Sequence, residues 1–315
     1  MIAYLQRRLL HSLVVFIIVC TLTFVLIRLA PGLPQIMTGD LLTNEDRQLF
    51  RENLGLDRPI WEQYFVWWGN LLRGDLGPSW TERAPVLQVI MDRLPNTLIL
   101  LVTSLTLAVV IGIPIGILSA VKRYSLIDYF FSTFAIGGLA IPTFWMALLM
   151  ILLFSVNLGW LPSAGMQTIN EGFSVVDRAR YLVMPTIVTA TGILAQLVRY
   201  TRSSMLEVLT NDYIRTARAK GLGETTVLSR HALKNALIPV ITVIGLQIPR
   251  FIGGSIIVET IFAWPGIGRL AYNSAITRDY PLIMGLTLLV SVVVLLSNLL
   301  TDLVYTLVNP RIRLT

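Results

Sequence analysis

The sequence predicts an all-α, polytopic membrane protein with six transmembrane helices, a small external helical segment between the first two, and a polar, basic loop between the fourth and fifth. Apolar residues make up 55% of the 315 residues and charged residues only 14%, whereas soluble domains carry about 25% charged residues. Stretches with few or no charges recur, each close to the ~20 apolar residues that a span needs. They cover residues 9–27, 94–121, 129–170, 181–198, 236–262 and 280–301.

The first of these stretches is interpreted as a retained span, because its apolar core is longer than the ~7–15 residues of a signal peptide. It contains Cys20, the only cysteine of the chain. An intramolecular disulfide is therefore impossible, and no metal site is indicated. Prolines within the spans, including Pro142, predict kinks.

The placement of lysine and arginine predicts that both termini lie in the cytoplasm, because cytoplasmic segments carry the excess of these residues. On this assignment the inner segments include Arg7, Arg8, Lys122, Arg123 and Arg202. The opposite side has fewer basic residues, and the acidic residues of the 31–94 segment offset their charge. The net charge of +7 therefore indicates membrane orientation and contact with lipid, and nucleic acid is not an expected partner.

The external segment, residues 31–94, carries its own helix signals. Thr43 followed by Asp46 predicts a capped helix start, and Pro59 predicts the start of a second helix. A third short amphipathic piece, 85–93, leads into the second span. We expect a cap of helices on the outer surface, which either meets the substrate or only packs.

The loop at 199–235 is the most informative stretch, because it interrupts the apolar pattern with an ordered, basic one. Asn211 or Asp212 predicts the start of a helix that Gly221 ends, and a second short helix is expected over 224–229. Two helices separated by a glycine are typical of a docking surface. For each basic residue alone, contact with lipid headgroups is the better explanation, but it does not explain the pattern of two helices separated by a glycine.

Two ionisable residues interrupt the fifth span, where charges are costly and usually face protein or water. Arg250 and Glu259 are nine residues apart, so on a straight helix they lie on opposite faces and do not pair. At least one is therefore expected to face a cavity or another subunit. The alternatives are a translocation pathway and a structural ion pair.

The loop resembles the cytoplasmic loop of the dipeptide/oligopeptide/nickel permease family, the membrane subunits of type I ABC importers. The resemblance lies in RTARAKGL at 215–222 and HALKNA at 231–236. It is supported by stretches at 28–32, 54–59, 74–79, 253–269, 278–281 and 309–313, so that it covers nearly the whole chain.

The resemblance implies that residues 221–229 form a coupling helix seated in a cleft of an ATPase subunit. The implied coupling residues are Ala217, Arg218, Ala219, Lys220, Gly221, Leu222, Gly223, Glu224, Leu228, Arg230 and His231. It further implies four kinds of region: a first span at 1–30, the external segment, a five-helix permease core at 95–310, and a cytoplasmic tail at 311–315.

The implied function is that of a permease subunit, not an enzyme, in an ATP-driven importer of short peptides in a bacterial inner membrane. Nickel, glutathione or another small solute is the alternative cargo. The implied partners are a second homologous permease subunit, two ATP-binding subunits and an extracytoplasmic substrate-binding protein. No cofactor is expected in this chain, because ATP and Mg²⁺ belong to the ATP-binding subunits.

Two other classes of function are weighed against this one. A stand-alone secondary transporter needs coupling-ion sites and usually an internal repeat, and the sequence shows no repeat. A membrane-embedded enzyme needs a nucleophile–base or metal constellation. The sequence contains no phosphate-binding loop, H-E-x-x-H or G-x-S-x-G motif, so no catalytic residue is expected.

Overall fold

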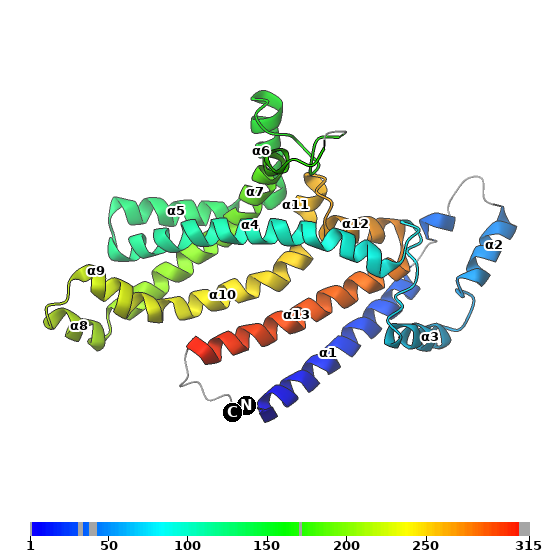
Figure 1. Ribbon diagram of the computed structural model, residues 1–315, viewed down its shortest axis with the longest axis horizontal. Coiled ribbons are helices and arrows are strands. Elements are labelled where there is room, and N and C mark those ends of the chain that lie inside the picture. The colour runs from blue at the N-terminus through cyan, green and yellow to red at the C-terminus, as the bar shows by residue number, and fades with distance from the viewer. Residues whose placement is uncertain (1, 31–33, 38–42, 170–171, 309–315) are drawn as a thin grey trace. The chain divides into compact units, whose positions relative to one another are not determined.

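The computed structural model describes residues 2–30, 34–37, 43–169 and 172–308 (Figure 1). Over these ranges the chain is helical, and the pairing of extended segments is limited to one bridge between Pro78 and Pro85. The backbone polar groups are thus largely satisfied within each helix, which is what a chain in lipid requires. The predicted fold class, an all-α membrane protein, is confirmed.

Five helices are long and apolar enough to cross a membrane in the described part of the chain. They are α1 (Ile2–Leu29), α4 (Val86–Val121), α7 (Val175–Leu209), α10 (Leu233–Gly254) with the turns before it, and α13 (Tyr280–Val308).

The predicted third span differs from a single straight helix. It consists of α5 (Leu126–Ala140) and α6 (Thr143–Met150), the latter extended by the π-helical η2 (Ile151–Asn157), with a bend of 99° between the two parts. Pro142 explains the break, because proline has no N–H to donate and forces the preceding residue out of the helical region. The spans therefore number six if the bent pair counts as one span.

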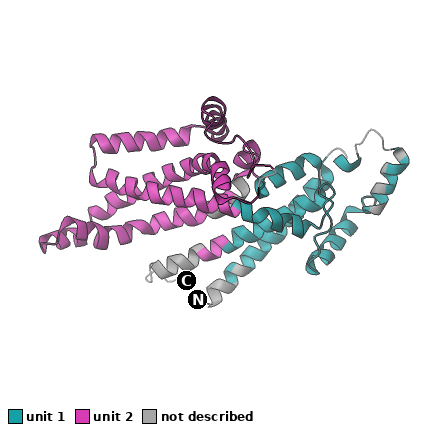
Figure 2. Ribbon diagram, turned by 45° about the horizontal axis from the view of Figure 1, so that its top comes forward, with its two compact units in different colours: residues 1–97, 265–296, 314–315 teal, residues 98–264, 297–313 magenta. Residues whose placement is uncertain are grey.

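The chain divides into two compact units, coloured separately in Figure 2. Unit 1 comprises residues 1–97, 265–296 and 314–315, and unit 2 comprises residues 98–264 and 297–313. The boundary falls inside α4 and again inside α13.

Unit 1 contains the external helices. α2 (Asn44–Asn53) begins with the predicted cap, in which the Asp46 N–H donates to Thr43 Oγ1 at 3.1 Å and the Thr43 N–H donates to Asp46 Oδ2 at 2.9 Å. The Thr43 hydroxyl also donates to Asp46 Oδ2 at 2.7 Å, and these side-chain and backbone hydrogen bonds from Thr43 hold the pKa of Asp46 below its usual value. α3 (Ile60–Leu72) begins after Pro59, as predicted.

The predicted third piece, 85–93, leads into the second span as expected, and from Val86 onward it forms the first turns of α4. No glycine separates it from the apolar residues that follow, so there is no signal to stop the helix. Unit 1 is completed by η1 (Gln35–Met37), α12 (Ile267–Thr277) and the first turns of α13.

A buried aspartate joins two distant stretches of unit 1. Asp279 is fully buried before the first residue of α13, and its carboxylate accepts hydrogen bonds from Ser79 Oγ at 2.6 Å and from Thr81 Oγ1 at 2.8 Å. It also accepts from the Thr81 N–H at 2.9 Å. The two family stretches at 74–79 and 278–281 are therefore one structural feature.

Unit 2 is organised around α7, whose buried side chains face α4, α5 and α10. α4 approaches it through two glycines. A β-carbon at Gly116 would lie 2.6 Å from Thr201 Cβ and 2.9 Å from the Val198 carbonyl oxygen, and one at Gly112 would lie 3.2 Å from the Leu194 carbonyl oxygen. Such small residues permit close contact between helices in a membrane.

Candidate docking site

The predicted first helix of the basic loop is present as α8 (Asp212–Ala219). Asn211 precedes it in an extended conformation, and Gly221 follows it with φ +77°. The Gly221 N–H donates to the Arg218 carbonyl oxygen at 2.9 Å. The left-handed backbone at this glycine ends the helix, because residues with a β-carbon avoid that region.

The second helix differs from the prediction. Residues 221–223 are not helical, and α9 (Glu224–Thr226) continues through the π-helical η3 (Val227–Ala232) directly into α10. The expected separate helix over 221–229 is therefore wrong in its boundaries. No glycine or proline occurs between Glu224 and Ile238, so nothing interrupts the helix before the span. The short helix that stands alone in this loop is α8.

The loop has a hydrophobic core of its own, which fixes α8 to the ends of the long helices. Ile214 and Ala217 are its buried residues on α8. The core is completed by Ala120 of α4, Met205 and Val208 of α7, and Val227, Ala232 and Ala236. Burial on both sides of the turn makes the loop a fixed part of unit 2.

Two polar contacts close the loop across the glycine turn. Arg218 donates to both carboxylate oxygens of Glu224, from Nε at 3.1 Å and from Nη2 at 2.7 Å. This hydrogen bonding to Glu224 raises the pKa of the Arg218 guanidinium above its usual value. Asn235 Nδ2 donates to the Tyr213 hydroxyl at 2.9 Å. The ion pair is half exposed, so its role is to set geometry more than to add stability.

The residues implied in coupling fall into three groups. Arg218, Ala219, Lys220, Gly221, Leu222, Gly223, Glu224 and Arg230 are exposed. Leu228 and His231 are half buried, and Ala217 is buried in the core of the loop. Tyr213 and Arg215 of α8 are exposed as well, although the Tyr213 hydroxyl is held by Asn235. The loop thus offers an aromatic ring and cations on a rigid support, which suits a protein partner.

The fifth span is broken where the sequence analysis assumed a straight helix. α10 ends at Gly254, and α11 (Ile256–Ile261) begins after Ser255. Glu259 is fully buried in α11 and accepts a hydrogen bond from Ser255 Oγ at 2.8 Å. The side chain of Arg250 lies outside the described residues. The expectation that Arg250 and Glu259 lie on opposite faces assumed one straight helix, and that assumption is wrong. The pathway role of both residues stays a prediction.

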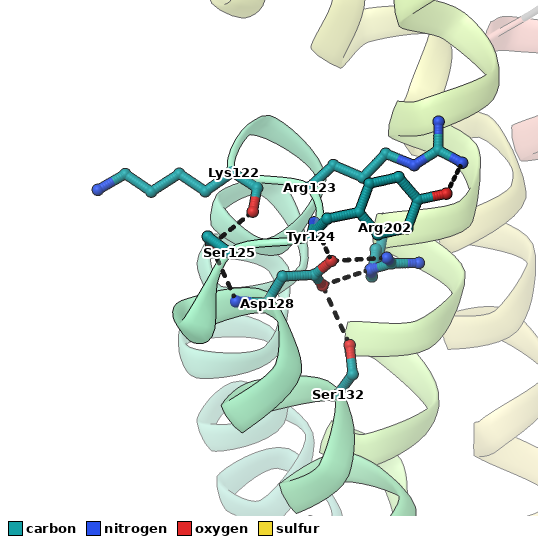
Figure 3. Close-up of polar contacts among 7 residues, drawn as sticks. All are labelled: Lys122, Arg123, Tyr124, Ser125, Asp128, Ser132 and Arg202. Atoms are coloured by element: carbon teal, nitrogen blue, oxygen red, sulfur yellow. Dashed lines mark hydrogen bonds and ion pairs between the residues drawn. The ribbon is translucent and has the colours of Figure 1, made fainter.

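An ion pair between a buried carboxylate and a half-buried arginine, which the sequence did not predict, joins the turn after α4 to α7 (Figure 3). Asp128, at the start of α5, is 2% exposed and accepts from Arg202 Nε at 2.6 Å and Nη2 at 2.8 Å. It also accepts from the Tyr124 N–H at 3.0 Å and from Ser132 Oγ at 3.2 Å. The Asp128 carboxylate thus accepts these four hydrogen bonds, which compensate its charge for the loss of water, as a buried charge requires.

The local sequence explains how this carboxylate is placed. Ser125 Oγ accepts from the Asp128 N–H at 3.3 Å and donates to the Lys122 carbonyl oxygen at 2.6 Å. Ser125 is therefore the N-cap of α5, and Ser-x-x-Asp before an apolar run was the available signal. The sequence places Arg202 only among the basic residues of the inner side and gives no signal for its pairing with Asp128.

The described residues contain no group of three or more His, Cys, Asp or Glu side chains that could hold a metal ion. What the loop provides is a supported surface. α8 and the Asp128–Arg202 pair lie in the same unit, and both contact α7.

Residues 112–314 match the family described as binding-protein-dependent transport system inner membrane component, and residues 1–101 match its N-terminal family. The chain is 49% identical over 314 residues to the oligopeptide transport system permease protein AppB of Bacillus subtilis, covering 99% of both. It is 42% identical to the dipeptide transport system permease protein DppB of Escherichia coli K12, again over 99% of both chains.

Among solved structures, the chain is similar to a chain of the MetNI methionine ABC transporter in an inward-facing conformation. The TM-score is 0.56 at 21% identity, over 71% of this chain and 97% of that one. At this identity the likeness concerns the fold alone, and it agrees with the helical membrane architecture.

Proposed function

We propose that this chain, which belongs to the family of binding-protein-dependent transport system inner membrane components, imports short peptides as the permease subunit of an ABC importer. The observation that carries the proposal is identity over almost the whole length. Relatives that are 49% and 42% identical are named as oligopeptide and dipeptide permeases. Family members are transport subunits, and the ATPase is a separate subunit.

The basic loop is the proposed contact with that ATPase. We place α8 in the contact, with Tyr213, Arg215, Lys220 and Leu222 toward the partner, because these side chains are exposed around the glycine turn. Ala217 supports them from beneath. The predicted coupling residues Gly221, Gly223 and Glu224 shape the turn. ATP and Mg²⁺ are held by the partner, whose closure on ATP moves α8 and with it α7.

The wider assembly follows from the same membership. We infer a second homologous permease subunit, two ATP-binding subunits and an extracytoplasmic substrate-binding protein. The chain is an integral membrane protein, and we assign it to the bacterial inner membrane with both termini in the cytoplasm. Glu259 and Arg250 are proposed to lie along the translocation pathway, supported by the burial of a carboxyl group at the break between α10 and α11.

The test is a charge reversal on the outer face of the loop. The double variant Arg215→Glu with Lys220→Glu should lose the co-purifying ATPase and ATP-dependent uptake of a labelled dipeptide into membrane vesicles. Lys122→Glu is the matched control, because Lys122 is exposed on another turn of the same unit. Unchanged co-purification in the double variant would contradict the docking assignment, and uptake of a solute other than peptides would contradict the cargo.

A further inference from the structure

A cavity of about 430 Å³ lies within unit 1. Its lining comes from four places in the sequence: the last turns of α1, the α2–α3 region, the 75–80 turn and the start of α13. Four of the stretches that carry the family resemblance, 28–32, 54–59, 74–79 and 278–281, therefore meet at one hollow. The residues that matter for its chemistry are Phe24, Arg28, Glu52, Asp75 and Tyr280.

Arg28 is the unusual residue of this lining. Its guanidinium lies between two aromatic rings, 5.3 Å from the Phe24 ring centre and 5.2 Å from that of Tyr280. The Nη1 atom is buried, and it has no hydrogen-bond partner among the described residues. Aromatic faces attract a cation but accept little hydrogen bonding from its edge, so this nitrogen is left with unused donors, which is costly for a charged group.

The neighbouring charges do not supply the missing acceptor. Arg58, the other cation of the lining, donates to Glu62 at 3.2 Å. Asp75 Oδ1 accepts from the Gly77 N–H at 2.8 Å, and Glu52 Oε1 accepts from Gln48 at 3.1 Å. Each carboxylate retains further acceptor capacity. Arg28 is therefore a cation of the lining that lacks an acceptor, and because its Nη1 is buried, only its other two nitrogens can face the cavity. Glu52 and Asp75 are exposed residues of the same lining whose carboxylates still accept hydrogen bonds.

The surroundings of the cavity are those of a membrane interface. Arg28 lies in the last turn of an apolar span, next to exposed leucines at 22, 26 and 29, which are 57%, 66% and 65% exposed. α3 exposes Trp61 and Phe65, 66% and 68%, four residues apart on one face. Exposed leucines suit lipid tails, and tryptophan on an amphipathic helix suits the headgroup level.

We propose that this cavity binds the headgroup of an aminophospholipid, with its phosphate accepting hydrogen bonds from Arg28. Arginine is suited to phosphate because its planar fork donates two parallel hydrogen bonds. Glu52 and Asp75 accept from the primary ammonium group. Phosphatidylethanolamine fits this pairing of charges, whereas phosphatidylglycerol has no cation to meet the carboxylates.

The experiment measures lipid retained by the assembled transporter, purified in detergent and titrated with phosphatidylethanolamine, by native mass spectrometry. Arg28→Gln should weaken binding ~10-fold to ~100-fold, the loss expected for hydrogen bonds to a charged group. Arg58→Gln is the matched control, since Arg58 lines the same cavity but is already paired. Its retention should equal that of the unaltered chain. Phosphatidylglycerol should bind more weakly than phosphatidylethanolamine.

Three outcomes would overturn the proposal: equal retention in Arg28→Gln, equal loss in both variants, or displacement of the lipid by millimolar dialanine. The last outcome would show that the cavity takes a peptide carboxylate. If Arg28→Gln does not assemble, Arg28→Lys replaces it, because lysine keeps the charge and loses the fork. Retention of Arg28→Lys equal to that of the unaltered chain would then reject the headgroup site. The comparison of Arg28→Gln with Arg58→Gln does not depend on the cargo.

Discussion

Replacing Gly116 by alanine tests the close contact between α4 and α7. The added β-carbon would lie 2.6 Å from Thr201 Cβ and 2.9 Å from the Val198 carbonyl oxygen. Both atoms are fixed to the backbone of α7, so neither moves aside by a change of rotamer. The two helices must separate by about 1 Å, a gap that forfeits a quarter to a half of the dispersion energy between the atoms it parts.

The expected cost follows from two opposing effects. Overpacking of a well-packed contact costs about 1–3 kcal/mol, and alanine regains ~0.5–1 kcal/mol over glycine inside a helix. We therefore expect a net destabilisation of ~1–2 kcal/mol for Gly116→Ala. Gly137→Ala in α5 is the matched control, because a β-carbon there meets nothing within 4 Å, and it should be neutral or slightly stabilising.

Thermal unfolding of the purified chain in detergent measures the difference. Gly116→Ala should melt a few degrees lower than the unaltered chain, since ~1 kcal/mol shifts Tm by roughly 2–4 °C in proteins of about 200 residues. Gly137→Ala should melt at or above it. If Gly116→Ala proved as stable as the control, α4 and α7 would not touch at this glycine, and the account of their packing would be refuted.

Three further predictions concern the loop and the two buried aspartates. Gly221→Ala should destabilise α8 by ~1 kcal/mol because the backbone at Gly221 is left-handed, and the change should appear as faster amide hydrogen exchange. Gly223→Ala is the control and should leave exchange unchanged, because Gly223 has φ −61°. Equal effects of the two substitutions would contradict this prediction. Asp128→Asn should cost ~2 kcal/mol by weakening the acceptor of Arg202, and an unchanged melting temperature would argue against the pair. Asp279→Asn should speed proteolysis of the loop that it anchors, and equal cleavage rates would reject that anchor.

The sequence predicted those features that depend on local chemistry. The boundaries of α8 were correct because an extended Asn211 and a glycine with φ +77° leave a signature within a few residues. The caps at Thr43 and Pro59 were correct for the same reason. Each is decided by the backbone conformation and hydrogen bonds of one short segment.

Contacts between distant segments left no such signature. Ser79 and Asp279 are 200 residues apart, and Asp128 and Arg202 are 74 apart, so a single sequence offers no reason to pair them. The straight fifth span was a different kind of error, because Gly254 and Ser255, where α10 ends, are poor helix formers. The signal was present, and the assumption of one continuous helix concealed it.

The π-helical winding of η3 has a consequence for how the loop and the fifth span tolerate change. Val227 and Ala232 are five residues apart and both fully buried in the core of the loop. In an α-helix, five residues amount to 500°, which would turn them about 140° apart, whereas an i→i+5 turn brings them to nearly the same face. Such a turn behaves as one inserted residue that shifts the register of everything after it. The docking loop and the transmembrane helix can therefore each keep the face that it needs, although they are one uninterrupted rod.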